Sequence, residues 1–87
     1  MTTLETAIVP VQFWPLTATK LVLRTGQFTP PPWYLYSLLD ASGSVLAQNS
    51  IQMSQADWNA WPAGLGPEGD ANYQLDSICR TLNLTRA

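Results

Sequence analysis

The chain has 87 residues, a net charge of −2 and 11% charged residues, against about 25% in typical globular proteins. This length supports one small domain over residues 1–87, and 46% hydrophobic residues exclude a chain that is disordered by composition. The four basic residues form no cluster, which argues against nucleic acid or an anionic membrane surface as the partner. No apolar run approaches the roughly 20 residues needed to span a bilayer.

Two strands are predicted in the first third of the chain. Residues 7–14 alternate apolar side chains with a period of two, and Pro10 places this strand at a sheet edge because proline cannot donate a ladder hydrogen bond. Residues 17–19 are expected to form a short link, and residues 20–28 alternate as a second strand. The prolines at 30–32 favour an extended connection.

The sequence between residues 33 and 53 predicts a β-hairpin. The turn formers Asp40, Ser42 and Gly43 separate a mostly apolar run at 33–39 from an alternating run at 45–53. The first run is apolar on both faces, which is typical of a central strand or of a strand whose second face is covered.

Two helices are predicted after the hairpin. Ser54 is expected to cap a short helix, since Asp57 stands three residues further on. After a glycine-rich loop, Asp70 is expected to cap a second helix that runs to about residue 82 or 84. The apolar stripe of that helix, spaced for one helix face, consists of Leu75, Ile78, Cys79 and Leu82.

The predicted fold class is α+β, an antiparallel β-meander of three to four strands followed by two C-terminal helices packed on one sheet face. Because the helices cover one face, the other is expected to stay open and to carry Tyr34, Tyr36, Leu38 and Val22. We expect one of the two faces of the strand at 33–39 to meet another protein chain, either a second copy or a neighbour in an assembly. The candidate interface residues are Tyr34, Tyr36, Leu38, Trp14 and Trp33.

Catalytic groups are scarce in this sequence. There is no histidine, the commonest general base and metal ligand. Cys79 falls in an apolar helical stripe and is expected to be structural, in keeping with a reducing compartment. Glu68 and Asp70 flank Gly69, but a calcium site needs about six oxygens and the EF-hand spacing is missing. We therefore expect no enzyme, no cofactor and no metal ion.

The four tryptophans suggest an alternative. Trp58 and Trp61 lie three residues apart and are expected to pin the short helix to the sheet. Trp14 and Trp33 adjoin prolines at strand ends, where they suit stacking on a partner's side chain or on a sugar ring. The alternative function is a small carbohydrate-binding module with Trp14, Trp33 and Tyr34 as its platform.

The C-terminal half carries a succession of motifs. They are a D-x-x-G-x-V-L turn at 40–46, a serine-capped helix with tryptophan at 54–61, a Gly/Asp loop at 66–70 and an L-x-L-T-R ending at 82–86. In these motifs the chain resembles small proteins encoded in the structural regions of tailed bacteriophages and prophages. The resemblance implies a virion or assembly component and carries no catalytic residue with it.

The expected function is thus a non-enzymatic, phage-derived structural or assembly protein that acts by protein–protein contact. The expected partners are a second copy of the chain or other virion and assembly proteins. The start of the chain carries no positively charged segment of a secretory signal. We accordingly expect a location in the host cytoplasm or in the virion.

Overall fold

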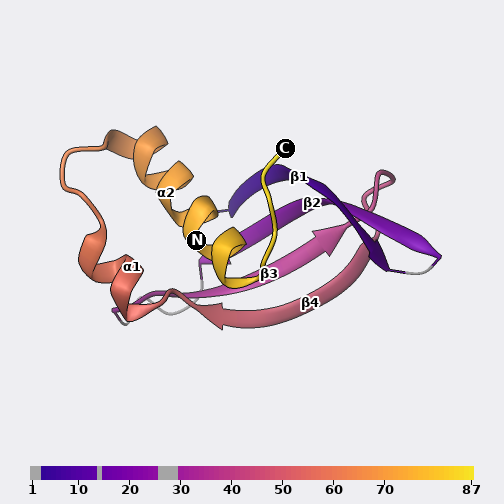
Figure 1. Ribbon diagram of the computed structural model, residues 1–87, viewed down its shortest axis with the longest axis horizontal. Helices are drawn as coiled ribbons and strands as arrows, with labels where there is room; N and C mark the ends of the chain where they lie inside the picture. Colours follow the sequence, from indigo (N-terminus) through magenta and orange to yellow (C-terminus); the bar gives the residue numbers. More distant parts are fainter. Residues whose placement is uncertain (1–2, 14, 26–29) are drawn as a thin grey trace.

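The chain folds into an antiparallel meander followed by two helices, as predicted (Figure 1). The computed structural model describes residues 3–13, 15–25 and 30–87. The strand order in the sheet follows the sequence, β1-β2-β3-β4. The elements are β1 (Thr3–Phe13), β2 (Leu16–Thr25), β3 (Trp33–Leu39), β4 (Val45–Gln52), α1 (Gln55–Ala60) and α2 (Gly66–Thr81).

The first two strands begin four residues earlier than predicted. The expected link at residues 17–19 is wrong, because Thr17 pairs with Gln12 and its Oγ1 donates to Gln12 Oε1 at 3.1 Å. The predicted ends of these strands, Trp14 and Phe28, lie outside the described residues. The edge position of β1 is confirmed, and the register between β1 and β2 shifts around Pro10.

The hairpin of β3 and β4 lies where its turn chemistry places it. Asp40 Oδ1 accepts hydrogen bonds from the Ser42 N–H at 3.0 Å and the Ser44 N–H at 2.9 Å. Gly43 has a φ of 91°, a conformation that glycine adopts without the steric cost of a Cβ atom. The predicted strands at 33–39 and 45–53 therefore match the observed ones to within one residue.

The two helices start differently. The Ser54 cap of α1 is confirmed, since its Oγ accepts the Asp57 N–H at 3.1 Å. The predicted start of α2 at Asp70 is wrong, because the helix begins at Gly66 with Pro67 in its first turn, where a missing N–H costs nothing. Asp70 instead accepts the Trp61 Nε1–H at 2.9 Å, from within the helix.

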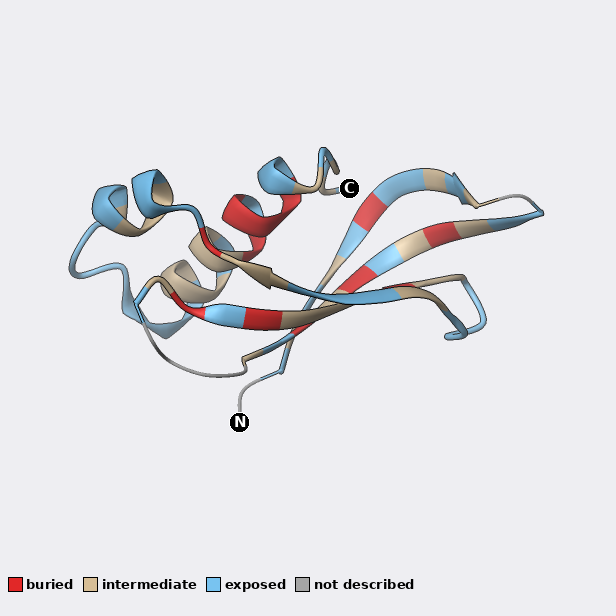
Figure 2. Cartoon of the chain, turned by 90° about the horizontal axis from the view of Figure 1, so that it is seen from below, coloured by how far each residue is buried: buried red, intermediate tan, exposed pale blue. Residues whose placement is uncertain are grey.

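The core lies between α2 and the sheet face beneath it (Figure 2). Leu75, Ile78 and Cys79 of the predicted helical stripe are buried, and Leu82 is half-buried against them. The buried residues contributed by the strands and by the residue after β4 are Ile8, Ala18, Leu21, Leu23, Tyr34, Leu38 and Met53. The β1–β2 hairpin extends past the helices, which contributes to the 41 Å length of a molecule 23 × 22 Å across.

A polar network joins α1 to α2. The Asp57 carboxylate accepts a hydrogen bond from buried Ser77 Oγ at 2.6 Å and another from Arg80 Nη2 at 2.8 Å. These bonds, led by the one from Ser77, hold the pKa of Asp57 below its usual value. Beside this network, Trp61 stacks on Tyr73 with ring centroids 5.1 Å apart.

Candidate protein-binding face

Strand pairing assigns each side chain to one face of the sheet, because directly opposite residues of an antiparallel pair point to the same side. One side, here called the covered face, lies under α2 (Figure 2). The other side is here called the open face. Paired rows on the covered face are 6–21–38–47 and 4–23–36–49, and those on the open face are 7–20–39–45, 5–22–37–48 and 3–24–35–50.

The predicted placement of Tyr34, Tyr36 and Leu38 on the open face is wrong. Tyr34 is 1% exposed and Leu38 is 6% exposed, and both belong to the core under α2. Tyr36 shares their face and is half-buried against the core. The register puts Leu38 opposite the buried Leu21 and Tyr36 opposite the buried Leu23. Tyr34 lies two residues before Tyr36 in the same strand, so all three share the side that α2 covers.

The Tyr34 hydroxyl is a structural group in this fold. It donates to Gln74 Oε1 of α2 at 2.6 Å and so ties β3 to the helix. Burial raises the pKa of Tyr34 to about 12, because the low-dielectric surroundings disfavour the phenolate. The hydroxyl therefore stays protonated as a donor throughout the neutral range.

The open face carries an apolar strip along its centre, which is defined as Val22, Trp33, Leu35, Leu39 and Val45. Trp33 is 41% exposed and Val45 is 55% exposed, while the other three are half-buried. Val22 is the one residue whose predicted open-face position agrees with the pairing.

Polar side chains lie beside the apolar strip and also within it. On the β1–β2 side, Lys20 Nζ lies 3.6 Å from Glu5 Oε2, and exposed Arg24 lies further along β2. Ser37 lies between Leu35 and Leu39 on the same face of β3, and Gln48 Nε2 of β4 donates to its Oγ at 3.1 Å. Apolar side chains interspersed with neutral polar ones are compatible with a protein–protein contact surface, whose apolar fraction as a whole is close to that of the remaining surface.

The structure separates the aromatic residues that were expected to stack on a sugar. Trp33 and Tyr34 are neighbours in β3, so their side chains point to opposite faces. Trp14 lies outside the described residues. Trp33 and Tyr34 therefore do not form a shared platform.

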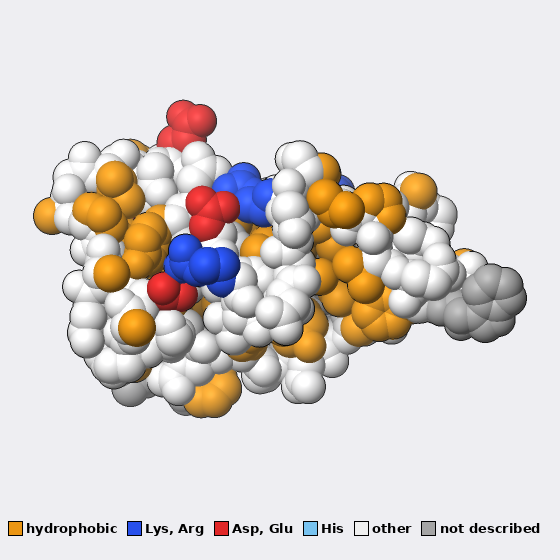
Figure 3. All heavy atoms as spheres, in the orientation of Figure 1, with side chains coloured by type: hydrophobic (Ala, Val, Ile, Leu, Met, Phe, Trp, Pro, Cys, Tyr) orange, Lys and Arg blue, Asp and Glu red, His pale blue; other side chains and the backbone are white. Residues whose placement is uncertain are grey.

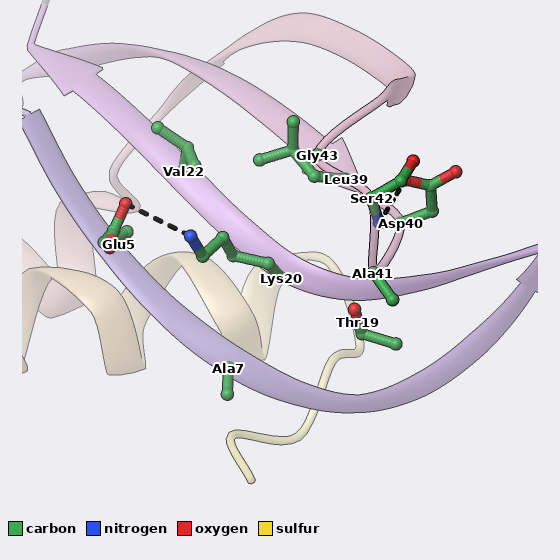
Figure 4. Close-up of a pocket in the computed structure, with 10 residues that line it drawn as sticks. All are labelled: Glu5, Ala7, Thr19, Lys20, Val22, Leu39, Asp40, Ala41, Ser42 and Gly43. Atoms are coloured by element: carbon green, nitrogen blue, oxygen red, sulfur yellow. Dashed lines mark hydrogen bonds and ion pairs between the residues drawn. The ribbon is translucent and has the colours of Figure 1, made fainter.

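A hollow of about 540 Å³ opens on the open face beside the β3–β4 turn (Figure 4). Its floor is formed by Ala7, Lys20 and Leu39, and the turn forms one wall. The Asp40 carboxylate at this wall is held by the Ser42 hydroxyl and by N–H groups of the turn, which lower its pKa. Both carboxylates of the lining are thus engaged, Asp40 with its own turn and Glu5 with Lys20.

The covered face also shows apolar surface at the end of the sheet that α2 does not reach (Figure 3). Hydrophobic side chains gather over that end, whereas Lys, Arg, Asp and Glu side chains gather near the helices. The half-buried apolar residues of that end include Val11, Phe13, Leu46 and Ala47.

The described part of the chain offers few side chains for metal binding or for nucleophilic catalysis. No cluster of three or more His, Cys, Asp or Glu side chains there is placed to hold a metal ion. Burial raises the pKa of the Cys79 thiol, which disfavours the nucleophilic thiolate. Among the described helices, none is both long and apolar enough to cross a membrane.

Comparisons with known proteins give no family assignment. No family model matches the chain, and neither the curated proteins nor the solved structures contain a significant match.

Proposed function

We propose that this protein is a non-enzymatic structural or assembly component that acts by protein–protein contact through the apolar strip of its open face. The observation that carries the proposal is the strip itself, five apolar side chains from β2, β3 and β4 on the sheet face that α2 leaves open. The resemblance of the C-terminal motifs to small phage structural-region proteins points to a virion or assembly role, in the host cytoplasm or in the particle.

Composition supports a binding role for this surface. With 11% charged residues, the chain has few groups to keep a sheet face wetted. Trp33 and Val45 are the most exposed members of the strip. A partner that covers them gains a binding free energy of about 25 cal/mol for each Å² of apolar surface removed from water. Trp33 is also of the residue type that most often dominates binding energy at interfaces.

Co-expression with the products of flanking genes tests the proposal. The wild-type chain should co-purify with one of these proteins at a fixed ratio, and Leu35→Glu should abolish that complex because it places a charge in the strip. Trp33→Ala should weaken the complex as well, by removing the largest exposed ring of the strip. Chemical cross-linking of the complex should join the partner to the open face.

The matched control is Leu65→Glu, the same chemical change at a residue that is 40% exposed in the loop between the helices. This variant should keep the complex. Circular dichroism and thermal melting must show that Leu35→Glu remains folded. A complex that survives both Leu35→Glu and Trp33→Ala in folded protein would contradict the assignment of the strip as the binding surface.

A further inference from the structure

The two edges of the sheet are treated differently by this chain. The edge of β1 is closed by the residues after α2, since the Val9 N–H donates to the Thr85 carbonyl at 2.7 Å and the Ala87 N–H donates to the Ala7 carbonyl at 3.0 Å. Pro10 and the shifted register of β1 disrupt that edge further. Within the described residues, β4 pairs with β3 and with no other strand (Figure 1).

The pairing of β4 shows which of its backbone groups point outward. The Met53 N–H donates to the Pro32 carbonyl at 3.0 Å, so the alternation of an antiparallel ladder turns residues 51, 49 and 47 toward β3. The N–H and C=O groups of Gln48, Ser50 and Gln52 therefore face away from the sheet. The Ser50 N–H confirms this direction, because its hydrogen-bond acceptor is the Asn49 side chain, Oδ1, at 2.8 Å.

The sequence of β4 lacks the usual protection of a free edge. Natural edge strands carry charged residues, prolines or inward-pointing charges that prevent pairing with another chain. From Val45 to Gln52 there is no charged residue and no proline. A register shift near Leu46 bends the start of the strand, which leaves residues 47–52 as the regular part of the edge.

We propose that this edge pairs with β4 of a second copy, antiparallel and about a two-fold axis near Asn49 and Ser50, so that two sheets join into one. An uncharged strand meets its own copy without like-charge repulsion. The side chains of Gln48, Asn49 and Ser50 each hold both donors and acceptors, so each satisfies its symmetry-related counterparts. In the dimer the Ser50 N–H would donate to a backbone carbonyl of the partner copy in place of the Asn49 side-chain Oδ1.

The size of this edge determines the strength of the dimer. Six residues at ~3.4 Å each span about 20 Å, and a sheet is about 10 Å thick, which gives roughly 200 Å² of contact section. Stable dimers bury about 800 Å² per copy. The paired form is therefore weak and depends on concentration, with a dissociation constant in the micromolar range or above.

The test is sedimentation velocity of the whole chain from about 1 µM to about 1 mM, with backbone amide exchange followed by NMR over the same range. A monomer–dimer equilibrium is expected, and the amides of Gln48, Ser50 and Gln52 should gain protection as concentration rises. Ser50→Pro should weaken the dimer about tenfold or more, because each copy loses one outward donor without losing a bond to β3. Circular dichroism should show that this variant is folded.

A second pair of variants tests the edge pairing without a proline substitution. Gln48→Lys should weaken the dimer through repulsion across the axis, and added salt should restore part of the loss. Gln55→Lys, the same change on the exposed surface of α1, should leave the dimer unchanged. Leu35 lies on β3 opposite Ser50, and Leu35→Glu leaves every outward N–H and C=O group of β4 in place. It should therefore leave the dimer intact, which separates this inference from the proposed function.

Two results would overturn the edge pairing. One is a wild-type chain that stays monomeric over the whole range of concentration. The other is a dimer that Leu35→Glu disrupts while Ser50→Pro and Gln48→Lys leave it unchanged, because that pattern places the contact on the open face.

Discussion

Replacing Tyr34 with phenylalanine removes one hydroxyl from the junction between β3 and α2. Tyr34 is 1% exposed, and its hydroxyl donates to Gln74 Oε1 at 2.6 Å. A hydrogen bond of this kind contributes about 0.5–1.5 kcal/mol net, and an acceptor left unsatisfied adds to the loss. Because Gln74 is half-buried and its oxygen can turn toward water, we expect Tyr34→Phe to lower the free energy of unfolding by about 1–2 kcal/mol.

The same hydroxyl makes stability depend on pH at the alkaline end. Burial raises the pKa of Tyr34 from its ordinary 10.0 to about 12 in the folded state. Below pH 10 both states are protonated and the contribution of the hydroxyl is fully present. Between pH 10 and 12 the unfolded state loses its proton first, so the folded state loses stability as pH rises. A pKa difference from 10.0 to about 12 corresponds to roughly 2–3 kcal/mol as an upper value.

Urea unfolding of the wild type and of Tyr34→Phe from neutral pH to pH 12 measures both effects. The variant should be less stable at neutral pH and should lose less stability above pH 10 than the wild type. Tyr36 and Tyr73 are present in both proteins, so the difference between the two curves isolates Tyr34. Equal stability at neutral pH together with an equal alkaline slope would refute this account of the junction.

Three further predictions follow from the packing. Leu38→Ala should cost about 2–5 kcal/mol because it leaves a cavity under α2, whereas Leu35→Ala on the open face should cost clearly less, as measured by urea unfolding. Ser54→Ala should lower the melting temperature through a loss of about 0.5–2 kcal/mol, while Ser54→Asp keeps a cap and should be nearly neutral. Because the pKa of Asp57 is lowered in the folded state, its contribution to stability is present above pH 4 and is lost as pH falls through the folded-state pKa. Asp57→Asn should therefore reduce the fall in melting temperature at acid pH, as measured by a pH series of melting curves.

The sequence predicted the elements whose signals are local. The β3–β4 turn follows from the hydrogen bonds that Asp40 makes within four residues, and the start of α1 follows from Ser54 and Asp57. The helical stripe at 75–82 was also predicted, because its spacing does not depend on what it packs against. The start of α2 was missed because Asp70 is a good capping residue by type, whereas Pro67 marks the true first turn.

The two faces of β3 could not be assigned from β3 alone, because both are apolar. The missing information lies in β2, where Leu21 and Leu23 alternate with Lys20 and Arg24. That alternation identifies the solvent-facing side of β2. Because Lys20 pairs with Leu39 and Arg24 with Leu35, the register assigns Leu39 and Leu35 to the same side. The register depends on long-range pairing between strands, which the local pattern of β3 does not determine. The predicted faces of β3 were therefore interchanged, and the strand pairing of the folded sheet corrects them.

The edge pairing and the open face have a joint consequence for partner binding. A two-fold axis perpendicular to the sheet keeps the faces of both copies on the same side, so a dimer formed through β4 presents two apolar strips in one plane. Two linked sites bind a repetitive surface more tightly than one, without any new contact. Ser50→Pro should therefore lower the apparent affinity for a densely immobilised partner and leave the affinity for a single soluble partner unchanged, whereas Leu35→Glu should lower both. Surface plasmon resonance at high and low partner density measures the difference, and equal losses for Ser50→Pro at both densities would show that the edge contributes to the partner site itself.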